Sequence, residues 1–199
     1  MMYGANISGS EAGFFSELKG DFPPAEKWLL TNELWDYASA CYQLPKVQQL
    51  CLRMQDEFAV DVTVLLAAGW AAMQGTEAHW PAILPTLVQW QEEIICPLRA
   101  IRRKLNKNLA PEHLIRSELL SLEIKTEQTA LAYLYHGLTQ LDVHQRYDKF
   151  SRTSLTDLNL KSYIEWRTGI SRDEHQQLAL LSEQLGGWLS SYSPPLTDI

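Results

Sequence analysis

The sequence has few cysteines and no apolar run long enough to cross a bilayer. Its three cysteines (Cys41, Cys51 and Cys96) form no CxxC pair, and their odd number cannot pair completely, so we expect reduced core residues. The longest nearly apolar stretch, 62–73, is shorter than the roughly 20 residues that a membrane-spanning helix needs. The N-terminus has neither a basic start nor an apolar run. These absences predict a soluble cytoplasmic protein that does not associate with membranes.

The familiar motifs of catalysis and metal binding are also missing. Glycine-rich phosphate loops, a GxSxG elbow and HExxH do not occur, and neither does the ExxH pairing of di-iron bundles. The five histidines are scattered along the chain. We therefore expect no metal site and no cofactor, and the sequence contains no recognisable catalytic apparatus.

Basic side chains are the minority, 17 against 24 acidic ones, which gives a net charge of −7. The average field repels phosphate, so nucleic acid and anionic lipid are disfavoured as main partners. The balance is uneven, because residues 99–116 carry six basic side chains and one acidic side chain. A local basic site remains possible there.

What the chain does contain is helical periodicity. Residues 62–73 are apolar on every side except at Thr63, which is typical of a helix surrounded by other helices. No alternating pattern with hairpin turns predicts a sheet. We therefore predict an all-α, single-domain bundle of about six to seven helices around this central helix. Glycine, serine and proline content predicts a loosely ordered segment over 1–25, a helical domain over 26–190 and a tail over 191–199.

Capping and proline signals set the expected helix limits. Apolar residues recur at helical spacing from Leu30 to Cys41 and predict a first helix, and Pro45 is expected to begin the second. The other expected helices are 62–73 with Asp61 as its N-cap, about 85–96 with a kink or fresh start at Pro97, about 111–142, about 155–167 before Gly169, and a last helix with a Ser171–Glu174 capping box that ends at Gly186–Gly187.

The basic segment predicts one charged helical face. Arginine's planar fork suits carboxylate and phosphate groups, so this face is a candidate anion or partner site, and a solvated or ion-paired face is the alternative. The expected basic residues are Arg99, Arg102, Arg103 and Lys107, beside an apolar stripe of Leu98, Ile101 and Leu105.

The long helix places a carboxylate among its apolar residues. On a helical wheel Glu127 falls between Leu131 and Leu134, so we expect it to face the core, with Arg116 and Glu123 on the flank. A buried carboxylate needs a partner, so at least one of Arg99, Arg102, Arg103 and Arg116 should contact Glu123 or Glu127. A structural ion pair and a ligand-binding or catalytic group both fit this pattern. The apolar face is expected to comprise Leu120, Ile124, Leu131, Leu134, Leu138 and Leu141.

Seven tryptophans are an unusually large number for 199 residues. Trp35, Trp70 and Trp90 fall in or beside apolar stripes, and they are expected either to fill the core or to wall a pocket. A buried indole N–H needs an acceptor, which Gln55 or Asp56 could supply. Trp35, Gln55 and Trp70 therefore join the arginines and glutamates as candidate ligand-binding residues.

An ordered set of residues over about 32–142 resembles a bacterial family of small helical proteins of unknown function. The resemblance implies an all-helical cytoplasmic bacterial protein with no established activity, and a helical extension over about 143–190. The family pattern often has glycine near Ala59 and asparagine near Thr63, where this chain differs. The matching residues are Leu34 to Ala38, Tyr42, Pro45, Val47, Cys51 to Gln55, Asp61, Val62, Leu65, Leu66, Trp70, Trp90, Pro97 to Arg99, Arg102, Arg103, Leu105, Arg116, Leu119, Glu123 and Glu127.

Three functions follow as hypotheses. The leading one is a non-enzymatic interaction or regulatory module with a protein partner, because catalytic motifs are missing and the basic helix could dock an acidic surface. The second is a binder of a small anion, or less favourably nucleic acid, through Arg99–Lys107. The third is an enzyme that uses Glu127 as an acid or base. The sequence does not indicate an oligomeric state.

Overall fold

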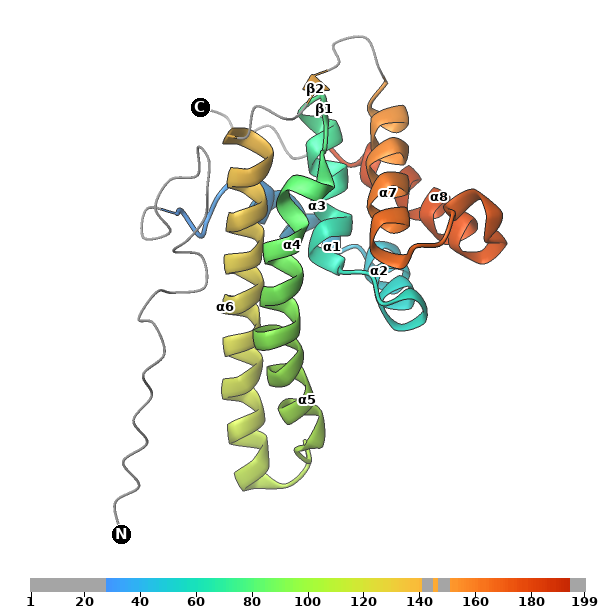
Figure 1. Cartoon of the computed structure of the whole chain (residues 1–199). Coiled ribbons are helices and arrows are strands. Elements are labelled where there is room, and N and C mark those ends of the chain that lie inside the picture. The colour runs from blue at the N-terminus through green and yellow to red at the C-terminus, as the bar shows by residue number, and fades with distance from the viewer. Residues whose placement is uncertain (1–27, 141–144, 147–150, 194–199) are drawn as a thin grey trace.

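The computed structural model describes residues 28–140, 145–146 and 151–193, which form an all-α bundle as predicted (Figure 1). A π-helical segment (Gln91–Ile95) joins α4 to α5 without a break, so the described chain forms seven helical rods, within the predicted number. The expected loose segment 1–25 lies outside the described residues, as does the expected tail 191–199 except for its first three residues, of which Ser191 ends α8. The helices are α1 (Glu33–Tyr42), α2 (Pro45–Phe58), α3 (Val62–Met73), α4 (Trp80–Trp90), α5 (Cys96–Lys104), α6 (Ala110–Gln140), α7 (Arg152–Thr168) and α8 (Gln176–Ser191).

Helix α3 is the predicted central helix. Every residue from Thr63 to Ala72 is buried, and α3 contacts α1, α2, α6, α7 and α8. A Cβ on Gly69 would come within 2.5 Å of the Tyr37 hydroxyl oxygen, so only glycine fits this crossing. None of the helices in the described ranges is both long and apolar enough to cross a bilayer.

Local signals place several helix ends correctly. Pro45 lies in the first turn of α2, and the Asp61 side chain accepts a hydrogen bond from the Thr63 backbone N–H at the start of α3. Gly169 ends α7 in the left-handed conformation that glycine adopts without strain. These three predictions are confirmed.

The predicted start at Pro85 is wrong. Helix α4 begins at Trp80 and continues through Pro85, because its buried face, which includes Ile83 and Leu87, holds the helix despite one lost hydrogen bond. The π segment follows, and the Cys96 N–H bonds the Gln91 carbonyl five residues earlier. This wider turn carries the helix into α5, with Pro97 in the first turn.

The predicted limits of the last helix are also wrong. Ser171 precedes a short 3-10 helix (Arg172–Glu174) and makes no side-chain cap, whereas the His175 side chain caps α8. Helix α8 continues through Gly186 and Gly187 to Ser191. Gly186 is buried beside α7, and the buried residues on either side of it, Leu185 and Leu189, hold the helix together through the two glycines.

Two unpredicted features tie α7 to the centre. Strand β1 (Thr76–Glu77) pairs antiparallel with β2 (Gln145–Arg146), a two-residue ladder within an otherwise helical fold. Buried Asn159 of α7 accepts a hydrogen bond from the Ala78 N–H at 3.0 Å and donates to the Thr76 carbonyl at 3.0 Å. Because α7 also packs along α3, buried residues of α7 and α8 belong to the same apolar core as α3.

Helices α5 and α6 form a hairpin whose far end extends beyond the other helices (Figure 1). The apolar face of α6 is buried only in its second half, at Leu131, Leu134 and Leu138. Leu120 and Ile124 are 47% and 46% exposed, contrary to prediction, because this part of α6 lies beyond the central core. Leu141 lies outside the described residues.

The C-caps of α2 and α7 allow a matched test of backbone strain. Ala59 and Gly169 both have positive φ, 54° and 66°, and each donates its N–H to the carbonyl four residues earlier. Ala59 is exposed, so Ala59→Gly should relieve strain without opening a cavity. We expect it to raise the free energy of unfolding by about 0.5–1 kcal/mol, measured by urea denaturation.

Gly169→Ala is the reverse control. No atom lies within 4 Å of the Cβ it would add, so any loss of stability comes from the backbone alone. We expect a loss of about 0.5–1 kcal/mol. Equal stabilities for the wild type and both variants would contradict the strain at these caps.

Candidate functional site

Two arginines of α5 form ion pairs with two glutamates of α6. An Arg99 Nη donates to Glu127 Oε1, and Arg102 Nε donates to Glu123 Oε1 at 2.6 Å. The predicted contact between the basic segment and the long helix is therefore confirmed at both glutamates. Arg116 does not contact either carboxylate; it donates to the backbone carbonyl of Arg102 near the end of α5.

The burial of the two glutamates is the reverse of the prediction. The Glu123 side chain is 4% exposed and the Glu127 side chain is 30% exposed. Both glutamates pair with α5 and border the same cavity, but Glu123 is the one that is closed off from water. Burial raises the pKa of Glu127 above its ordinary value, and the hydrogen bond from Arg99 opposes that shift.

The first cavity, here called the α6 cavity, has a volume of about 450 Å³ and lies among α1, α2, α3, α5 and α6. Its size is within the usual range of ligand pockets. Its apolar walls include Trp35, Tyr42, Leu52, Leu120, Ile124 and Leu131. Its polar lining includes Gln55, Arg99, Arg102, Arg103, Glu123 and Glu127. Apolar walls with a few charged groups at one side are typical of a site that orients an amphipathic ligand.

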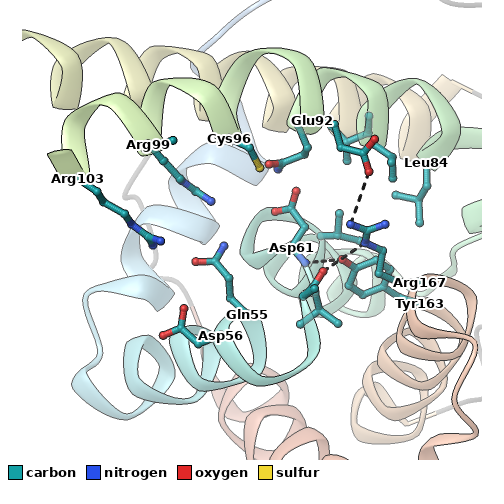
Figure 2. Close-up of a pocket in the computed structure, with 17 residues that line it drawn as sticks. Gln55, Asp56, Asp61, Leu84, Glu92, Cys96, Arg99, Arg103, Tyr163 and Arg167 are labelled. Atoms are coloured by element: carbon teal, nitrogen blue, oxygen red, sulfur yellow. Dashed lines mark hydrogen bonds and ion pairs between the residues drawn. The ribbon is translucent and has the colours of Figure 1, made fainter.

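The second cavity, here called the α7 cavity, has a volume of about 370 Å³ and lies among α2, α3, α4, α5 and α7 (Figure 2). Gln55, Arg99 and Arg103 line both cavities. Figure 2 shows these three side chains extending toward one another at one end, and Arg167 of α7 reaching Glu92, 4.0 Å away, at the other. The aliphatic lining of the α7 cavity includes Val60, Val64, Leu84, Leu87 and Val88.

Asp61 points into the α7 cavity toward α5 (Figure 2). Its Oδ1 accepts from the Thr63 N–H at 2.7 Å and from the Thr63 hydroxyl at 2.8 Å, and its own N–H donates to the Tyr163 hydroxyl at 2.6 Å. Its Oδ2 is buried and has no hydrogen-bond partner. Burial raises the pKa of Asp61, and the Thr63 hydrogen bonds together with the charges of Arg99 and Arg167 oppose the shift.

The predicted basic helical face does not continue from Arg103 to Lys107. Helix α5 ends at Lys104, so Lys107 lies in the loop before α6 and lines neither cavity. Arg103 is exposed at the boundary of both cavities. It makes no hydrogen bond or ion pair with any other described residue, so its guanidinium is available to a ligand.

Of the nine candidate ligand-binding residues, seven line the α6 cavity. The exceptions are Arg116 and Trp70. Trp70 is buried in the core, where its ring centroid lies 5.5 Å from that of Tyr135. The seven are Trp35, Gln55, Arg99, Arg102, Arg103, Glu123 and Glu127. Their role in binding a ligand stays a prediction.

Two further sequence interpretations need correction. Cys96 is exposed and lines the α7 cavity, whereas Cys41 and Cys51 are buried as expected. Neither Gln55 nor Asp56 accepts a hydrogen bond from an indole; Trp90 Nε1 instead donates to the backbone carbonyl of Thr126 at 3.1 Å. Backbone acceptors of this kind depend on helix packing, which the sequence does not reveal.

Sequence reasoning missed four groups of the α7 cavity. The sequence predicts Asp61 only as a helix cap and does not single out Gln91, Tyr163 or Arg167. Tyr163 and Arg167 belong to α7, about 100 residues after Asp61, so no local pattern links them. Within the described ranges, no three His, Cys, Asp or Glu residues are grouped so that they could hold a metal ion.

A family model described as "Protein of unknown function (DUF2390)" matches residues 33–134. This agrees with the family resemblance that the sequence suggested. All residues that line the α6 cavity, from 35 to 131, fall within the matched range, whereas the α7 cavity also uses α7. No curated protein and no solved structure matches the chain.

Proposed function

This chain belongs to the DUF2390 family of proteins of unknown function, and we propose that it is a binding protein whose α6 cavity holds a small anionic ligand with an apolar body. One observation carries the proposal. Three arginines of one helix border an apolar-walled cavity, and only two of them pair with glutamates.

The charge balance favours an anion. Glu127 and Glu123 neutralise Arg99 and Arg102, so the cavity keeps one net positive charge, that of Arg103. A guanidinium binds carboxylate or phosphate through two parallel N–H donors. The anionic group of the ligand therefore belongs at the α5 side of the cavity, near Arg103.

The walls favour a ligand with an apolar body. Trp35 of α1 and Leu120 and Ile124 of α6 border the cavity, and both α6 residues are about half exposed. A ligand body seated against them would bury apolar surface that water now reaches. A free inorganic anion would leave these walls wet, so it is a poorer fit.

Acid–base catalysis by Glu127 is the weaker alternative. Its side chain borders the cavity, and burial raises its pKa in the direction that a general acid requires. However, Arg99 already holds the carboxylate, which fits a structural pair better than a proton donor. We therefore favour binding without chemistry.

Binding of phenylacetate and phenyl phosphate tests this proposal, with phenylacetamide as the uncharged control. We expect calorimetric titration to detect the two anions, with affinity that falls as salt is added. Arg103→Glu should weaken their binding at least about tenfold, because it replaces the available cation with an anion.

Lys104→Glu is the matched control, because Lys104 is exposed on the same helix and lines neither cavity. It makes the same change in net charge and should alter affinity by less than about twofold. Equal losses in both variants, or phenylacetamide binding as tightly as phenylacetate, would contradict an anion site at Arg103.

A second candidate function is a docking surface for an acidic protein at the end of the α5–α6 hairpin. Several large apolar side chains are exposed there, including Leu114 at 69%, Ile115 at 54% and Leu109 at 50%. They lie among the six basic residues of 99–116. An exposed apolar patch with a basic surround fits a partner surface that combines apolar and acidic side chains.

Crosslinked capture with hairpin variants tests this second candidate. A partner with an acidic surface should be recovered by the wild type and lost with Leu114→Glu. Leu180→Glu is the control, because Leu180 is also exposed, at 52%, but lies on α8. Identical recovery by all three proteins, or a partner that binds more tightly in high salt, would rule out this surface.

A further inference from the structure

Two buried polar atoms in the wall of the α7 cavity have no hydrogen-bond partner. They are Asp61 Oδ2, an acceptor, and Gln91 Nε2, a donor. Buried polar groups in native proteins are nearly always paired, because an unpaired group loses its contact with water and gains nothing in return. The other such atoms of the described residues belong to Trp70, His136 and Arg152, none of which lines either cavity.

The unpaired atoms have opposite hydrogen-bonding character. Asp61 Oδ2 requires a donor and Gln91 Nε2 requires an acceptor, so one ligand that carries both groups would satisfy both atoms. Asp61 is well fixed, because Thr63 holds its Oδ1 and Tyr163 holds its backbone N–H. Gln91 begins the π-helical segment, a feature that occurs often at functional sites.

The charged lining of the α7 cavity contains both signs. Arg99, Arg103 and Arg167 are the cations, and Asp56, Asp61 and Glu92 are the anions. The α6 cavity has instead an excess of one cation, so the two cavities suit different ligands. A balanced lining favours a zwitterion over a simple anion.

The rest of the lining is aliphatic. Val60 and Val64 at the α2–α3 junction face Leu84, Leu87 and Val88 of α4, and the cavity volume is about 370 Å³. An aliphatic surface of this kind binds a small apolar side chain. The cavity is also near the lower limit of ligand pockets, which favours a small molecule.

We propose that the α7 cavity binds an apolar α-amino acid, with the ammonium group at Asp61, the carboxylate at Gln91 and the side chain on the aliphatic lining. The α5 arginines supply the surrounding positive field for the carboxylate. The two proposed sites share Arg99 and Arg103 as a common wall, but Asp61 and Gln91 line the α7 cavity and not the α6 cavity.

Calorimetric titration of the full chain with L-leucine tests the proposal. We expect leucine to bind, whereas N-acetyl-leucine, which lacks the ammonium group, and leucinamide, which lacks the carboxylate, should each bind at least about tenfold more weakly. Asp61→Asn and Gln91→Met should each reduce leucine affinity by at least about tenfold, since each removes one of the two contacts.

Two matched variants serve as controls. Asp36→Asn and Gln89→Met make the same chemical changes at exposed positions that line neither cavity, and they should leave leucine affinity within about twofold. Asp61→Asn keeps a good N-cap residue. Because burial raises the pKa of Asp61, the charged carboxylate lowers stability above about pH 4, so Asp61→Asn should be at least as stable as the wild type at neutral pH.

Two variants distinguish a failure of this proposal from a failure of the proposed anion site. Asp61→Asn should leave phenylacetate binding unchanged, whereas Leu120→Glu should weaken phenylacetate binding and leave leucine binding unchanged. Leucine binding that is absent in the wild type, or equal in the wild type, Asp61→Asn and Gln91→Met, would overturn the proposal. The first result would mean that water alone meets the two unpaired atoms.

Discussion

The ion pairs between α5 and α6 are the interactions on which both cavities depend. Helix α5 has no buried residue, so apolar packing contributes little to its position. Glu123 is nearly sealed from water, and without Arg102 its charge would be strongly destabilising. Arg99 and Glu127 form the second pair, and Arg116 of α6 donates a hydrogen bond to the Arg102 carbonyl near the end of α5. These contacts fix the wall that the two cavities share.

The same region contains several buried polar and charged groups that the protein satisfies only in part. Burial raises the pKa values of two carboxylates near Arg99, Asp61 in the α7 cavity and Glu127 in the α6 cavity. Binding sites commonly carry such locally unfavourable groups, because a group that the protein itself satisfies is not available to a ligand. Around α3, whose residues from Thr63 to Ala72 are buried and mostly apolar, Trp70 Nε1 is the one buried polar side-chain atom of this helix without a hydrogen-bond partner. The apolar core centres on α3, whereas both proposed binding sites border α5.

Local chemistry made much of the fold predictable, and long-range packing limited the rest. The cap at Asp61, the stop at Gly169 and the apolar composition of α3 each act over a few residues, so the sequence alone indicates them. Ala59 shows the opposite case, because alanine gives no sign of the left-handed geometry that it adopts. The pairing of arginines with glutamates followed from the cost of burying charge. Which glutamate is sealed depends on where α5 crosses α6. The position of Gln91 in the α7 cavity depends on the π segment, which has no sequence signal, and on where α7 packs in the bundle.

A double-mutant cycle on Arg102 and Glu123 tests most directly whether the ion pairs hold α5 in place. The variants Arg102→Met, Glu123→Leu and the combination would be compared by urea denaturation. We predict that each single change destabilises the protein and that the double variant recovers much of the loss, with a coupling free energy of about 1.5–3 kcal/mol. Additive effects, with a coupling below about 0.5 kcal/mol, would mean that α5 is held by something other than this buried charge pair.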